Sequence, residues 1–156
     1  MRKHFFGKVL LTVLLAGSLA ACANADVINV KVTNKTDATI SIAFAQAQTD
    51  SGGDDFTPDR SKGWYNVEPG QTMTIKTYES SPFHSVYFYA TSKGGKRVWQ
   101  GKPGKDSRFG DRAFWIHPKN AFNTKGKRIP DGKKVYFRRM NSDRGDTIVL
   151  NLTVRK

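Results

Sequence analysis

The sequence predicts an all-β protein: a single antiparallel β-sandwich or open barrel of about eight short strands, preceded by a cleaved signal peptide. Three observations support this fold class. Apolar and polar residues alternate with a period of two through most of residues 26–156. Clusters of Gly, Pro, Asp and Ser separate these runs, and no stretch carries a sustained helical stripe of apolar residues.

The first two predicted strands form a hairpin. Apolar and polar residues alternate in INVKVT (28–33) and ISIAFA (40–45), and NKTDAT (34–39) between them has the composition of a turn. In the second run, Ala43 and Ala45 fall at positions of the outer face. We therefore expect these strands to be buried on one face only.

An aromatic pair leads into the next two strands. The sequence predicts a strand that ends at Val67, a turn over EPG (68–70) and a further strand in TMTIKTY (72–78). Because alternate residues of a strand point to opposite faces, Trp64 and Tyr65 are not expected to form one stacking platform. One of the two is expected to face the core.

Five further runs predict the remaining strands: HSVYFYAT (84–91), KRVWQG (96–101), RAFWIH (112–117), KKVYFRRM (133–140) and TIVLNLTV (147–154). Two long loops are expected, the acidic QTDSGGDDFTPDRSKG (48–63) and the basic QGKPGKDSRFGDR (100–112). No repeat or linker divides residues 26–156, so we expect one domain of ordinary size.

Residues 1–25 have the pattern of a bacterial export signal. Basic residues at positions 2, 3 and 8 precede an apolar run at 9–16, and small residues follow it. The apolar run is too short for a permanent membrane span.

Two cleavage sites compete at the end of this signal. LAAC (19–22) resembles a lipobox, in which Cys22 becomes the lipid-modified first residue, whereas ANA (23–25) is a site for ordinary signal peptidase. The chain's only cysteine falls at the lipobox position, which favours lipidation. The first strand begins almost at once, which leaves little tether and favours cleavage after Ala25. The protein is thus expected to be either periplasmic or secreted, or an outer-membrane lipoprotein.

Positive charge is concentrated in the second half of the chain. Residues 26–156 carry 23 basic and 13 acidic residues, a net charge of +10. Between residues 93 and 144 there are sixteen basic residues and four acidic ones. Such a field favours anionic partners, namely lipid head groups, acidic polysaccharide or, as the least favoured, nucleic acid, and it also serves solubility.

Four motifs occur in a characteristic order: VTNKT (32–36), SKGWYNVEPGQ (61–71), VYFYA (86–90) and VWQG (98–101). In order and spacing they resemble the uncharacterised bacterial domain family DUF1036, whose core motif is matched by Gly63, Trp64, Tyr65, Pro69 and Gly70. Members often carry cysteines where this chain has Val32 or Thr33 and Thr72, so any family disulfide is absent. The resemblance implies a compact exported β domain and no particular reaction.

Enzyme chemistry finds little support in the residues. Beyond the signal there are two histidines, His84 and His117, and neither sits in a recognised catalytic motif. The acidic loop lacks the spacing of an EF-hand, and no phosphate-binding glycine loop is present. We therefore expect no catalytic residues, metal or cofactor; a small hydrolase that uses Asp or Glu with His117 is the third alternative.

Binding is the stronger class, because aromatic residues interleave with the basic ones at Trp99, Phe109, Phe114, Trp115, Tyr136 and Phe137. Most of these rings are expected in the core, since a sandwich needs several large side chains. In KKVYFRRM, Val135 and Phe137 should point inward, which places a row of two cations and a ring outside. The candidate binding residues are Lys134, Tyr136, Arg138, Trp99 and Trp115.

The expected function is a non-enzymatic, exported module that binds an anionic, carbohydrate or lipid component of the envelope through its basic half. The alternative is a structural or assembly protein of the envelope that acts through protein contacts. Membrane association is expected only through lipidation or surface charge.

Cys22→Ser separates the two cleavage alternatives. If Cys22 is lipidated, the substitution moves the protein from the detergent phase to the soluble fraction, because the acyl chains supply the anchor. Mass spectrometry of the mature N-terminus checks this result. A free chain that begins at Asp26 rules out the lipoprotein.

Overall fold

The computed structural model describes residues 27–48, 60–79, 84–103, 110–140 and 147–154. These residues form ten strands and no helix, so the predicted all-β fold is confirmed. This part of the chain therefore offers no helix long and apolar enough to cross a membrane. The strands are β1 (Val27–Asn34), β2 (Ile40–Gln48), β3 (Arg60–Val67), β4 (Thr72–Glu79), β5 (His84–Ser92), β6 (Val98–Trp99), β7 (Arg112–Ile116), β8 (Phe122–Lys125), β9 (Lys133–Met140) and β10 (Thr147–Leu152).

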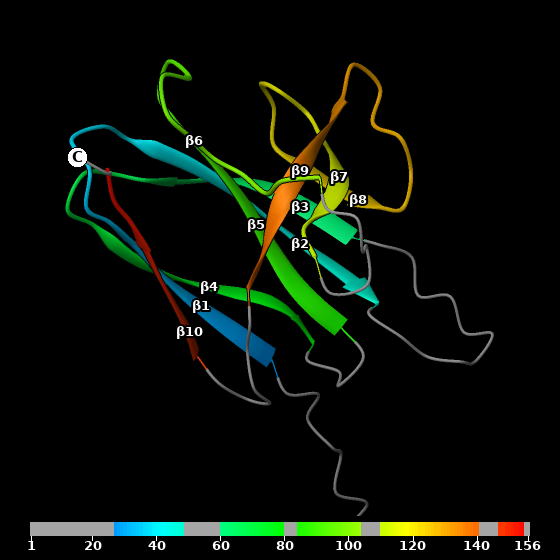
Figure 1. Cartoon of the computed structure of the whole chain (residues 1–156), viewed down its shortest axis with the longest axis horizontal. Helices are drawn as coiled ribbons and strands as arrows, with labels where there is room; N and C mark the ends of the chain where they lie inside the picture. The colour runs from blue at the N-terminus through cyan, green and yellow to red at the C-terminus, as the bar shows by residue number, and fades with distance from the viewer. Residues whose placement is uncertain (1–26, 49–59, 80–83, 104–109, 141–146, 155–156) are drawn as a thin grey trace, which may run out of the picture.

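The strands build two sheets of unequal width. The three-stranded sheet has the order β10-β1-β4, and the seven-stranded sheet has the order β7-β9-β5-β2-β3-β8, with β6 paired to β5. In Figure 1 the small sheet forms one layer, and β7, β8 and β9 curl away from it. The expected sandwich is thus present, joined to a half-barrel. One pair departs from the antiparallel expectation, because β10 runs parallel to β1. The expected hairpin of the first two strands was wrong, because β1 and β2 lie in different sheets and do not pair.

The central strands β2 and β5 are buried on both faces. Ile40, Ile42 and Phe44 face the small sheet, whereas Ala43 and Ala45 face the inside of the half-barrel, and all five are buried. The expectation that β2 is buried on one face only was wrong. The large sheet curls over its second face, which removes the alanines from water.

Two buried clusters result from this arrangement. The first lies between the sheets and includes Val30, Val32, Val86 and Phe88. The second fills the half-barrel with aromatic rings in contact, among them Tyr87, Tyr89, Phe114, Phe122 and Phe137. Burial raises the pKa of the Tyr89 hydroxyl, because the surrounding apolar groups disfavour its charged form.

Side chains of β3 close the half-barrel against β7. The Ser61 hydroxyl donates to the Trp115 carbonyl (2.7 Å), and the Trp64 indole N–H donates to the His117 carbonyl (2.9 Å). Strand β7 ends the order of the large sheet, where free carbonyls would be open to other strands. The two bonds use side chains of β3 to occupy one carbonyl of β7 and the carbonyl of the residue after it.

A buried asparagine ties the ends of both sheets together. The Asn34 side chain is fully buried; its amide donates to the carbonyls of Ala38 (2.9 Å) and Val67 (2.8 Å). Its side-chain oxygen accepts from the backbone N–H and the hydroxyl of Thr36. Because these contacts satisfy both donors and the acceptor, burial of this amide carries no unpaired polar group.

The turn between β3 and β4 has the predicted chemistry. Pro69 and Gly70 occupy its centre, Gly70 has a φ of 74°, and the Gln71 N–H donates to the Glu68 carbonyl (3.0 Å). Glycine suits the third position of such a turn because it adopts positive φ without strain. The Gly70 N–H also donates to the carbonyl of Asn34 (2.9 Å), which connects this turn to β1.

Trp64 and Tyr65 lie on opposite faces of β3, as predicted. Trp64 packs in the half-barrel against Tyr89 and Phe122, whereas Tyr65 packs against Phe44 between the sheets. Both rings therefore contact a buried cluster, where the sequence indicated only one. Gly63 precedes them in a crowded place: a Cβ there would lie 2.8 Å from the Ala43 Cβ and 2.9 Å from the Phe122 ring.

Two parts of the sheet were not predicted. Strand β8 was missed, because FNTK carries a single apolar residue in four. Strand β3 begins at Arg60, inside the expected acidic loop, because residues 60–63 pair with β8. Residues 49–59 of that loop lie outside the described residues. Residues 1–26 do so as well, and with them both predicted cleavage sites and Cys22.

Trp64→Ala should lower the free energy of unfolding by about 3 kcal/mol, the lower end of the range for large-to-small core changes, because the ring is half-buried. Trp64→Phe keeps a ring but loses the bond to His117 and should cost about 1–2 kcal/mol. Urea unfolding measures both values. Tyr136→Ala, which removes an exposed ring, is the control and should change stability little. An unchanged urea midpoint in Trp64→Ala would contradict the packing role.

Candidate functional site

Strand β9 carries the predicted row of exposed side chains. Phe137 is fully buried in the half-barrel, and Val135 packs against the same cluster. Lys134, Tyr136 and Arg138 point to the opposite face and are exposed. The predicted orientation of this strand is therefore confirmed.

The neighbouring strand β7 adds an aromatic residue to this face. Trp115 lies opposite Lys134 in the antiparallel pair, and Ala113 lies opposite Tyr136. Directly opposite residues share a face, so Trp115 stands beside the row. Alanine is small and covers little of its neighbour, and Tyr136 is 38% exposed.

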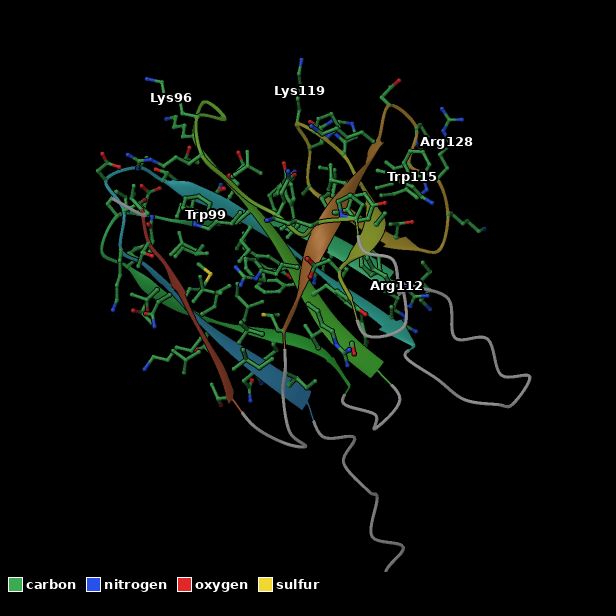
Figure 2. The ribbon with its side chains drawn as sticks, viewed as in Figure 1. Lys96, Trp99, Arg112, Trp115, Lys119 and Arg128 are labelled. Atoms are coloured by element: carbon green, nitrogen blue, oxygen red, sulfur yellow. The ribbon has the colours of Figure 1, made fainter. Side chains whose placement is uncertain are left out.

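Two cations lie over the Trp115 ring. The Arg128 guanidinium is 5.5 Å from the ring centroid, and the Lys134 ammonium is 5.9 Å from it. Both distances allow attraction between a cation and the π face. Figure 2 shows Trp115 and Arg128 close together. We call Trp115, Arg128, Lys134, Tyr136 and Arg138 the basic face.

A cleft opens where the small sheet ends. Arg138 lies opposite Phe88 in the β5–β9 pair, and Phe88 is buried between the sheets. The small sheet stops at β10, so the same face of β9 emerges from under it at Arg138. Between β6, β9 and β10 lies a cleft of about 710 Å³, lined in part by Trp99, Lys102 and Arg138. We call it the inter-sheet cleft.

The indole of Trp99 is held in a fixed orientation at this cleft. Its N–H donates to the carbonyl of Thr153 (3.2 Å), and its ring packs partly against the cluster between the sheets. The three tryptophans are all half-buried, and each lies in a different place: Trp64 in the half-barrel, Trp99 in the cleft and Trp115 on the basic face. They do not form one continuous aromatic surface.

The acidic group at the cleft is occupied by backbone donors. One Asp111 carboxylate oxygen accepts from the Lys102 N–H (2.8 Å) and the other from the Arg139 N–H (2.8 Å). Asp111 is the single acidic residue among the described residues that line the cleft. It fixes the loop after β6 onto β9, so Lys102 and Arg138 are held at the same opening.

A third cation at the cleft already has a partner. Arg97 pairs with Asp37, and their hydrogen bond lowers the pKa of the Asp37 carboxyl. For Lys102 and Arg138, by contrast, no ion pair with another described residue is present. These two charged groups are therefore available to a ligand.

His117 has a structural role in the turn after β7. Its Nδ1 accepts from the backbone N–H groups of Lys119 (3.1 Å) and Asn120 (2.9 Å). In the described ranges no cluster of three or more His, Cys, Asp or Glu residues is placed to hold a metal ion. Phe109 lies outside these ranges, as does the side chain of His84.

The sequence did not indicate four residues that shape this region: Lys102, Asp111, Arg128 and Thr153. Their roles depend on contacts between distant segments, such as the bond from Arg139 to Asp111, 28 positions away. The aromatic and basic composition of the second half was the only available signal, and it did not single them out.

Comparison with known proteins adds no relationship: no protein-family model, curated protein or solved structure matches this chain. The resemblance to the family DUF1036 stays a prediction.

Asp111→Asn should lower the free energy of unfolding by about 1–3 kcal/mol. In the unmodified protein both carboxylate oxygens accept from backbone N–H groups, whereas in the variant an amide NH₂ replaces one oxygen and leaves one of these N–H groups without an acceptor. Asp37→Asn is the matched control and should have little effect, since Asp37 is exposed. The small contribution of the Asp37 pair is present at neutral pH and is lost as the pH falls through the lowered pKa of Asp37. Urea unfolding at neutral pH measures both variants; equal midpoints would contradict the role of Asp111.

Proposed function

We propose that this protein is an exported, non-enzymatic binding module that holds an anionic component of the bacterial envelope on its basic face. The observation that carries the proposal is the position of the cations on β9. Lys134 and Arg138 flank an exposed tyrosine on a strand that lies between two others.

Protection of a sheet edge is the alternative explanation for these cations. Lysine and arginine often stand on edge strands, where they prevent pairing with other molecules. Strand β9 lies between β7 and β5 in the order of the large sheet, but β7 pairs only with its residues 133–137 and β5 only with its residues 138–140. Edge protection needs no aromatic side chains, so the Trp115 and Tyr136 rings beside these cations favour binding.

The spacing of the row suits an extended anionic partner. Alternate residues of a strand lie about 6.6–7 Å apart, so Lys134 and Arg138 stand about 13–14 Å apart. Lys134 pairs with Trp115 of β7 and Arg138 pairs with Phe88 of β5, so the sheet holds the backbone at both cations, which reduces the entropy lost on binding. Lipid head groups and acidic glycans both present negative groups over such distances, with nucleic acid the least favoured partner.

The export signal predicted in residues 1–25 supports an envelope location. It leaves two forms of the protein, one periplasmic or secreted and one anchored through Cys22. In either form the net positive charge would attract the protein to anionic envelope components.

A structural or assembly role is the second candidate, and strand β10 favours it. This strand ends the small sheet, its sequence TIVLNL carries no charge, and Val149 is 61% exposed. An uncharged, open edge of this kind can pair with a strand of another protein. A partner captured through β10 would not depend on the cations of β9.

The double variant Lys134→Glu/Arg138→Glu tests the binding proposal. We expect it to weaken binding to anionic vesicles or to an acidic polysaccharide by about tenfold or more, since two attractions become repulsions. Sedimentation or interferometry across a salt series measures this. Binding by the unmodified protein should fall steeply with salt, and the variant should lose most of that dependence.

The matched control is Lys96→Glu/Lys119→Glu, which makes the same charge change in two exposed turns away from the basic face. It should retain most of the binding. If both double variants lose binding equally, net charge rather than the basic face is responsible. If neither anionic partner binds, the proposed function is wrong.

A further inference from the structure

We propose that the inter-sheet cleft binds a carboxylate-bearing sugar residue of an acidic polysaccharide, whose following residues lie along the basic face. This inference rests on the proposed function and commits it to a glycan in preference to a lipid surface. Four features of the cleft support it.

The first feature is size and shape. At about 710 Å³, the cleft lies within the range of about 300–1,000 Å³ that small-ligand sites occupy. It lies between the two sheets: β6 of the large sheet and β10 of the small sheet both contribute consecutive residues to its lining. A single sugar residue at a chain end can enter such a recess, whereas the plane of a lipid bilayer meets only its rim.

The second feature is the fixed aromatic ring. Trp99 is tied through its N–H to the Thr153 carbonyl, so its ring keeps one orientation without a ligand. The C–H face of a sugar can pack on an indole through dispersion and burial of apolar surface. Because the ring is already held, little side-chain entropy is lost when a sugar packs against it.

The third feature is a place for one carboxylate. Lys102 and Arg138 line the cleft, and neither forms an ion pair with Asp111, whose two oxygens accept from backbone N–H groups. The guanidinium fork of arginine suits a planar carboxylate, with which it can form two parallel hydrogen bonds. Gln100 and Asn151 also line the cleft and offer amide donors and acceptors for sugar hydroxyls.

The fourth feature is continuity with the basic face. Arg138 belongs both to the lining of the cleft and to the row on β9. A glycan that leaves the cleft past Arg138 next meets the exposed Tyr136 ring and then Lys134. The spacing of about 13–14 Å along the strand lets a later acidic group reach this second cation.

The three tryptophans provide a separate signal for each location. In a ¹⁵N correlation spectrum each indole N–H gives one peak, assigned by the variants Trp64→Phe, Trp99→Phe and Trp115→Phe. The purified protein is titrated with trigalacturonate, with a neutral trisaccharide and with phosphatidylglycerol vesicles. Trp99 reports the cleft, Trp115 reports the basic face, and Trp64, held inside the half-barrel, serves as the internal reference.

We expect trigalacturonate to shift the Trp99 peak and the neutral trisaccharide to leave it in place. Lys102→Gln should weaken this titration about tenfold, the loss expected for one charge-assisted hydrogen bond. It keeps the backbone N–H that Asp111 binds, so the loop stays in place. Lys119→Gln, which removes a charge from an exposed turn, is the matched control and should leave the titration unchanged.

The other outcomes overturn the inference in distinguishable ways. If trigalacturonate moves only the Trp115 peak, the basic face binds a glycan and the cleft does not. If the protein binds only the vesicles, the proposed function stands with a lipid partner and the cleft inference is wrong. If Lys119→Gln weakens the titration as much as Lys102→Gln, the binding is not specific to the cleft. If neither trigalacturonate nor the vesicles bind, both the inference and the proposed function are wrong.

Discussion

The pairing of β2 with β5 is the interaction on which both layers of this protein depend. It extends from Ile40 opposite Ser92 to Gln48 opposite His84, and it presents apolar side chains on both faces. Large aliphatic and aromatic residues of β2 fill the space toward the small sheet, whereas its alanines leave room for the rings inside the half-barrel. A larger residue at Ala43 would meet the same crowding that excludes a side chain at Gly63. One strand pair therefore supports the sandwich and the half-barrel together.

The buried side chain of Asn34 complements this apolar core with a specific polar connection. Its amide joins β1 of the small sheet to the end of β3 in the large sheet, and its backbone receives the Gly70 N–H of the next turn. Hydrophobic contacts between the layers are non-directional, so they do not by themselves fix how one sheet lies on the other. A fully satisfied buried amide does, because any displacement of the sheets would leave its groups unpaired. The same network holds the turn that Pro69 and Gly70 form.

The sequence was informative wherever the local pattern decides the structure. Period-two alternation correctly placed Phe137 inside and Lys134 outside, and it placed Trp64 and Tyr65 on opposite faces. It failed where a second layer changes the environment: Ala43 occupies an outer position of its strand, and only the curl of the sheet buries it. The cleft could not be predicted either, because Asp111 joins the backbones of Lys102 and Arg139, which lie nine and 28 positions away from it. Binding by these residues remains a prediction from chemistry.

The unequal width of the two sheets explains why the basic face exists. Three strands cannot cover seven, so the face of β9 is buried at Met140 but exposed from Arg138 to Lys134. Solubility requires only that this uncovered face be polar, and residues of either charge would meet that need. The observed choice is narrower: two cations on the strand, a further cation over Trp115, and a tyrosine ring left in water. Exposed rings among like charges do not improve solubility, but they do add contact area for an anionic partner. The proposed binding role rests on this combination of cations and rings, which solvation alone does not require.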